Sequence, residues 1–195
     1  MKKIIYIHGK GGNSAEAEHY KKFFPTAEVT GFDYKAENVW DAVTEFQNFF
    51  NQFGKVKIIA NSIGAFYAMH ALSEKNIDAA FFISPIVDME KLILSMMARA
   101  NVTEKILCEQ KEIPTDFGEV LSWKYLCYVR KNKISWNVPT NILYGSNDFL
   151  TPLETMKNFA EKIGASLTVM QGGEHWFHTP AQMNFLDNWL EELTN

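Results

Sequence analysis

Residues 56–69 read Val-Lys-Ile-Ile-Ala-Asn-Ser-Ile-Gly-Ala-Phe-Tyr-Ala-Met, and this is the most informative part of the chain. An apolar, β-branched run ends at Ala60, and a helical pattern begins at Ser62. A serine at such a sharp turn projects its hydroxyl from a strained backbone, with a helix N-terminus behind it. The turn needs very small residues two positions before and after the serine, and Ala60 and Gly64 occupy them. Ser62 is therefore a candidate nucleophile, although a serine that only caps the following helix would fit the same local pattern.

Length and composition favour one globular domain. The chain has 195 residues, of which 47% are hydrophobic and 22% charged, and its net charge of −4 does not favour nucleic acid or an anionic membrane as a partner. No segment approaches the roughly 18 apolar residues of a membrane span. Cys108 and Cys127 show neither metal spacing nor a disulfide framework. We therefore expect a cytoplasmic protein without membrane insertion, bound metal or organic cofactor, acting on a small molecule, with its oligomeric state open.

Short apolar runs alternate with amphipathic helical patterns along the chain. The runs predict strands over 3–7, 28–32, 56–60, 79–84, 140–144 and 166–170. The helical patterns cover about 14–24, 40–54, 62–72, 153–164 and 180–193. Strands and helices joined by short connections indicate a parallel sheet covered by helices on both faces, with its sites at the carboxyl ends of the strands.

The alternation is interrupted once, over about residues 86–137, which is far longer than a usual connection. This segment is rich in leucine, methionine and aromatic residues, so it needs helices of its own. It leaves from the carboxyl end of a strand, and we therefore expect a lid that lines an apolar pocket. A helical excursion that only completes the core is the alternative.

Polar groups follow four of the predicted strands. They lie in His8–Gly12, at Ser62, in Gly145–Asp148 and in Gly172–His175. A serine hydroxyl needs a base within hydrogen-bond reach, and the base needs an acid that holds its tautomer. The chain supplies serine, aspartate and histidine in that order, which is the order of α/β-hydrolases and not of the two common serine protease types.

With these motifs the chain resembles a small α/β-hydrolase from Lys3 to the last helix, without the family's N-terminal antiparallel strand pair. The resemblance implies a three-layer fold with a mostly parallel six-stranded sheet and a helical lid insertion. It also implies that Ser62 attacks, His175 acts as the base and Asp148 orients the base. The backbone N–H of Lys10, or less favourably Gly11, and that of Ile63 would then form the oxyanion hole.

Three of these assignments have alternatives. His178 lies one helical turn beyond His175 and could be the base instead, and His8 is a weaker candidate for the same role. Asp88 could be the acid, because some family members place it after the fourth strand. Gly145-x-x-Asp148-x-x-x-Pro152 fits the usual pattern better, so Asp148 is preferred.

The resemblance and the strand-end residues together predict a serine hydrolase that cleaves a carboxylic ester, or a thioester, of a small apolar substrate through an acyl-enzyme. A hydrolase-fold binding protein or receptor with little turnover is one alternative, because fold and triad do not guarantee activity. A dinucleotide-binding oxidoreductase is a weaker one. It would use Gly9-x-Gly11-x-x-Ser14, in which serine replaces the third glycine, with Asp33 at the end of the next strand.

Overall fold

A computed structural model describes residues 2–194 and divides the chain into two compact units. The main unit comprises the residues up to Val87 and those from Ser135 onward, and the inserted unit comprises Asp88–Ile134. The inserted unit falls within the segment that the sequence separates as an insertion. Its role as a lid stays a prediction.

The main unit is built on a six-stranded sheet in which every pairing is parallel. In spatial order its strands are β2 (Ala27–Phe32), β1 (Lys2–Ile7), β3 (Val56–Asn61), β4 (Ile77–Ile83), β7 (Thr140–Gly145) and β8 (Ser166–Met170). Each lies within two residues of its predicted range, because buried β-branched runs fix both the type and the position of a strand. The predicted fold class is confirmed.

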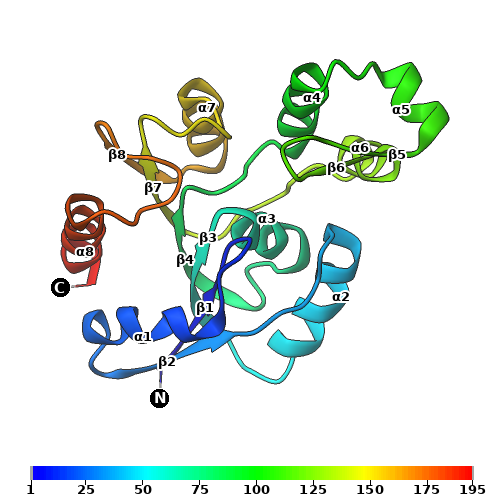
Figure 1. Cartoon of the computed structure of the whole chain (residues 1–195). Helices are drawn as coiled ribbons and strands as arrows, with labels where there is room; N and C mark the ends of the chain where they lie inside the picture. The colour runs from blue at the N-terminus through cyan, green and yellow to red at the C-terminus, as the bar shows by residue number, and fades with distance from the viewer. Residues whose placement is uncertain (1, 195) are drawn as a thin grey trace. The chain divides into compact units, whose positions relative to one another are not determined.

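Helices cover both faces of this sheet. On one face, α1 (Ala17–Tyr20) and α8 (Pro180–Thr194) pack against β1, β3, β4 and β7 (Figure 1). The side chains that meet in this layer include Ile4, Tyr6, Tyr20, Ile59, Phe81, Leu143, Leu186, Trp189 and Leu190. The opposite side carries α2 (Val39–Phe50), α3 (Ser62–Ala71) and α7 (Leu153–Ile163) (Figure 1).

Two helices of the main unit differ from their predicted form. The first is broken into the 3₁₀ turn η1 (Ser14–Glu16), α1 and the 3₁₀ turn η2 (Lys21–Phe23). The Asn13 cap and Pro25 hold this short segment at both ends, and terminal turns commonly tighten into 3₁₀ geometry. The second, α2, ends at Phe50, because residues 51–54 form turns instead of continuing to Gly54.

The inserted unit contains three helices and a small antiparallel strand pair. The helices are α4 (Met89–Arg99), α5 (Glu104–Gln110) and α6 (Trp123–Lys131), and the strands are β5 (Glu112–Pro114) and β6 (Val120–Ser122). The sequence predicts the helices but not the strand pair.

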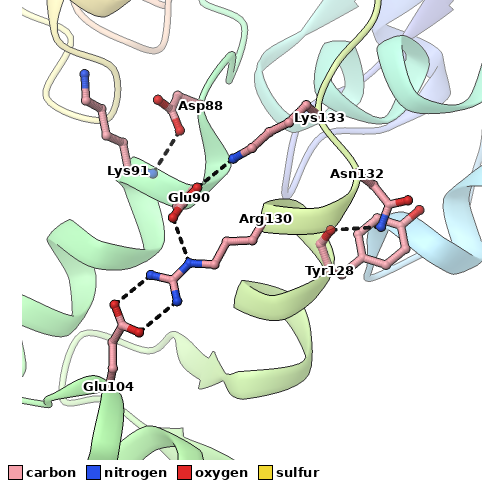
Figure 2. A network of polar contacts seen from close by, with 8 residues as sticks. All are labelled: Asp88, Glu90, Lys91, Glu104, Tyr128, Arg130, Asn132 and Lys133. Carbon is pink, nitrogen blue, oxygen red and sulfur yellow. Dashed lines mark hydrogen bonds and ion pairs between the residues drawn. The ribbon is translucent and has the colours of Figure 1, made fainter.

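Ion pairs centred on Arg130 join the helices of the inserted unit (Figure 2). The guanidinium binds both carboxylate oxygens of Glu104, at 2.6 and 2.8 Å, and its Nε lies 2.8 Å from Glu90. Lys133 adds a second cation to Glu90 at 2.7 Å. Hydrogen bonds from Lys133 and then Arg130 lower the pKa of Glu90, and the bond from Arg130 lowers that of Glu104. The network ties α4, α5 and α6 together.

The strand order places a topological switch point between β1 and β3, since the chain runs from β1 to the edge strand β2 and returns to the other side of β1. Ligands of open α/β sheets bind at the carboxyl ends of strands beside such a point. The loops after β1 and β3 carry His8–Gly12 and Ser62, so the switch point coincides with the predicted site. Among residues 2–194, no helix is both long and apolar enough to cross a bilayer.

Candidate active site

Ser62 lies at a sharp turn between β3 and α3, with a left-handed backbone φ of 49°. Non-glycine residues seldom adopt this conformation, and such strain concentrates at functional sites. The turn is crowded, because a Cβ on Gly64 would lie 2.3 Å from the carbonyl oxygen of His8. This close approach explains the requirement for glycine two residues after the serine.

Ser62, His175 and Asp148 form a continuous hydrogen-bonded chain. The Ser62 Oγ lies 2.7 Å from His175 Nε2, and His175 Nδ1 lies 2.7 Å from Asp148 Oδ2. The Asp148 side chain is fully buried and that of His175 is 13% exposed. A carboxylate accepts the Nδ1 proton, which leaves Nε2 as the acceptor for the serine hydroxyl. The structure therefore brings together the three residues that the sequence selects.

The loop after β7 holds Asp148 in place. Its second carboxylate oxygen accepts the N–H groups of Leu150 (2.8 Å) and Thr151 (3.2 Å). The Tyr144 hydroxyl donates to the Thr151 carbonyl at 2.6 Å. Burial, with a contribution from the charge of Asp148, raises the pKa of Tyr144 to about 12, so this phenol remains a donor. Backbone N–H groups thus hold the carboxylate, and the Tyr144 hydroxyl holds the loop segment that carries them.

The loop after β8 packs closely on the loop after β7. The Asn147 N–H donates to the Gly173 carbonyl at 2.8 Å, and a Cβ on Gly145 would lie 2.4 Å from that same oxygen. Gly172 has a φ of 75°, which turns the chain towards His175. The close approach at Gly145 and the left-handed turn at Gly172 therefore both require glycine in the loops that carry Asp148 and His175.

The alternative residues have other partners. His178 stacks on Trp176 with ring centroids 4.4 Å apart, and its Nδ1 lies 2.8 Å from the Trp176 carbonyl. His8 stacks on Tyr34 at 4.2 Å. Asp88 caps α4 by accepting the Lys91 N–H at 3.0 Å (Figure 2).

The proposed oxyanion donors lie on two neighbouring elements. Ile63 is in the first turn of α3, where backbone N–H groups have no partner within the helix. Lys10 lies in a turn closed by the Gly12 N–H and the Gly9 carbonyl (3.1 Å), followed by Gly11 with φ of 77°. A Cβ on Gly9 would lie 3.3 Å from the Ser62 Cβ, so this turn packs directly against the nucleophile.

The loop after β1 does not have the form that the dinucleotide-binding alternative requires. The loop after β1 leads into a three-residue 3₁₀ turn, whereas a dinucleotide phosphate would rest on the N-terminus of a full helix. Within residues 2–194, no group of three or more histidine, cysteine, aspartate or glutamate side chains could hold a metal ion.

Three residues that the sequence analysis did not select lie beside the site: Tyr6, Glu16 and Asn61. Asn61 Nδ2 donates to the Tyr6 hydroxyl at 2.9 Å, and that hydroxyl donates to Glu16. The sequence pattern Asn13-x-x-Glu16 could have identified Glu16, because it is typical of a capping box, and both hydrogen bonds of that capping box form. Tyr6 itself has the pattern of a core residue in a strand.

Solved structures share this architecture. Est1E from Butyrivibrio proteoclasticus matches with a TM-score of 0.73 and 15% identity, over 98% of this chain and 86% of that one. Mouse alpha/beta hydrolase domain-containing protein 10 matches with a TM-score of 0.73 and 17% identity, over 98% and 88%. A structure from work on carboxylesterases of Nitrososphaera gargenis matches with a TM-score of 0.64 and 17% identity, over 99% and 91%. No protein-family model and no curated protein matches the sequence. The chain has the α/β-hydrolase fold.

Proposed function

We propose that this protein is a serine hydrolase that cleaves a carboxylic ester, or a thioester, of a small apolar substrate through an acyl-enzyme. The observation that carries the proposal is the hydrogen-bonded chain from Ser62 through His175 to Asp148. The structural neighbours add support, because several are described as esterases or carboxylesterases and ferulic acid binds to Est1E. The preference for an apolar substrate rests on the sequence of residues 86–137 alone.

In the proposed first half-reaction, His175 Nε2 takes the proton of Ser62 as Oγ attacks the substrate carbonyl carbon. The negative charge that develops on the carbonyl oxygen is held by the N–H groups of Lys10 and Ile63, each worth about 2.7–4 kcal/mol in comparable enzymes. The imidazolium formed on His175 is stabilised by Asp148 and then protonates the leaving alcohol or thiol. The products are the free alcohol or thiol and an ester between the acyl group and Ser62.

In the second half-reaction, His175 takes a proton from water, which attacks the acyl-enzyme carbonyl. The tetrahedral intermediate collapses as His175 returns a proton to Ser62 Oγ, and the carboxylic acid leaves. Every proton in these steps moves between Ser62, His175, water and the leaving group, so the groups described above suffice for both half-reactions.

A panel of p-nitrophenyl esters of increasing acyl length tests this proposal. Ser62→Ala should abolish nearly all turnover and leave the unfolding transition close to that of the wild type. Ser73→Ala, two residues beyond the C-terminal end of α3, is the matched control and should retain full activity. Wild-type protein without turnover on any ester or thioester, or full activity in Ser62→Ala, would contradict the proposed function.

A further inference from the structure

A hydrogen-bonded bridge of a carboxylate, a phenol and an amide lies beside the nucleophile; its phenol, Tyr6, is buried, and its ends, Glu16 and Asn61, are partly exposed. Asn61 Nδ2 donates to the Tyr6 hydroxyl at 2.9 Å, and the hydroxyl donates to Glu16 Oε2. The other oxygen of Glu16 accepts the Asn13 N–H at 3.0 Å. The bridge therefore joins the end of β3 to the end of the loop that follows β1.

The direction of each hydrogen bond in the bridge is fixed. Tyr6 is fully buried and its ring stacks on Tyr20 at 4.9 Å. Burial is the largest cause that raises the pKa of Tyr6, and Tyr20 and Glu16 raise it further, so the phenol stays protonated. A protonated phenol donates to the carboxylate, and only the amide N–H₂ of Asn61 can then complete its hydrogen bonding. A bridge with one allowed arrangement holds its ends in one geometry.

The two ends of the bridge carry the two proposed oxyanion donors. Asn61 directly precedes Ser62 and Ile63, and Glu16 fastens the loop that contains Lys10. The loop rests on the carboxylate, since a Cβ on Gly12 would lie 2.7 Å from Glu16 Oε1.

We propose that Glu16, Tyr6 and Asn61 act as positioning residues that set the spacing between the two oxyanion donors. The inference rests on the proposed function, because it assigns the bridge a task in the same reaction. None of the three side chains needs to touch the substrate. Their effect is to hold two backbone N–H groups at the distance that the oxyanion requires, where small displacements are costly.

Tyr6→Phe and Glu16→Gln test the inference in the full-length protein. Tyr6→Phe removes only the central hydroxyl, and Glu16→Gln keeps an acceptor for the Asn13 cap, so this second variant preserves the surface turn. We expect kcat on a p-nitrophenyl ester to fall on the order of 10- to 100-fold in both, with KM within about twofold. The double variant should be no slower than the slower single variant, because both changes break one unit.

Thr140→Val is the matched control. Its buried hydroxyl also bridges two groups, accepting from Trp136 Nε1 at 2.8 Å and donating to the Val138 carbonyl at 2.7 Å, but at the opposite, amino-terminal end of β7. This variant should lose stability and keep its kcat.

A second readout separates positioning from loss of stability. A trifluoromethyl ketone, whose adduct with Ser62 carries an oxyanion, should bind the bridge variants roughly 10- to 100-fold more weakly, in proportion to their loss of kcat/KM. If the wild type is active and both variants keep its kcat and its inhibitor affinity, or change only in KM, the inference is wrong and the proposed function still stands. An inactive wild type overturns both.

Discussion

Asp148→Asn exchanges one carboxylate oxygen for an amide nitrogen, and the structure determines how the new side chain must lie. The carbonyl oxygen of the introduced asparagine would keep the two N–H bonds now made to Asp148 Oδ1 by Leu150 and Thr151. Its amide N–H₂ would then face His175 Nδ1, where Asp148 Oδ2 now lies at 2.7 Å. A donor at that position forces the imidazole proton onto Nε2, so the ring can no longer accept the Ser62 proton.

The expected magnitude follows from this inverted tautomer. The equivalent change in a Ser-His-Asp triad costs about 10⁴ in kcat, or about 5.5 kcal/mol in the barrier. Stability should change by only about 1 kcal/mol, because a neutral hydrogen bond replaces a charge-assisted one and both backbone bonds remain. A large loss of kcat with a small loss of stability is therefore the predicted combination.

Steady-state hydrolysis of a short p-nitrophenyl ester, together with urea unfolding, measures both quantities. Asp88→Asn is the control, because asparagine caps a helix as well as aspartate and should leave the cap on α4 and the activity intact. If Asp148→Asn retains kcat within about tenfold of the wild type, or if Asp88→Asn shows the large loss instead, the assignment of the acid is wrong.

Three further predictions concern stability. Gly64→Ala should lower the free energy of unfolding in urea by roughly 2–3 kcal/mol, because its Cβ would lie 2.3 Å from the His8 carbonyl oxygen. Gly54→Ala is the control, because its Cβ would meet nothing within 4 Å, and it should leave stability unchanged. Equal losses in the two variants would show that crowding is not the cause. Burial lowers the pKa of His70 to about 4, so between about pH 6.5 and 4 the unfolded chain binds a proton that the folded chain does not. The free energy of unfolding should therefore decrease as the pH is lowered through this range, by at most about 3 kcal/mol. If a His70→Gln variant shows the same dependence of unfolding free energy on pH, this reasoning is wrong. Arg130→Met should lower the free energy of unfolding by about 1 kcal/mol at low salt and by less at about 1 M salt, because the ion pairs of Arg130 are partly exposed. A loss that does not depend on salt would show that these ion pairs do not stabilise the fold.

The sheet and the position of the candidate site could be predicted because both depend on local sequence. Buried β-branched runs locate the parallel strands, and parallel strands bring their carboxyl ends to one edge. Ser62, Asp148 and His175 each follow such a run, so their convergence follows from the strand pattern without any long-range information.

Features set by tertiary contacts could not be predicted in this way. The strands Glu112–Pro114 and Val120–Ser122 have three residues each, too few for an alternating pattern to be recognised. Ser84 was expected to end its strand, but it adopts a left-handed φ of 43° while its N–H bonds to Leu143 of the neighbouring strand β7. Tyr6 and Asn61 are 55 positions apart, and only the pairing of β1 with β3 brings them together.

Covalent labelling is the most direct test of whether Ser62 is a nucleophile that His175 activates. After incubation with a fluorophosphonate, peptide mass spectrometry of the wild type should find a single adduct on Ser62. His175→Ala should react far more slowly, and Ser62→Ala should not be labelled. A wild type that stays unlabelled, or an adduct on any other residue that persists in Ser62→Ala, would show that Ser62 is not the activated nucleophile.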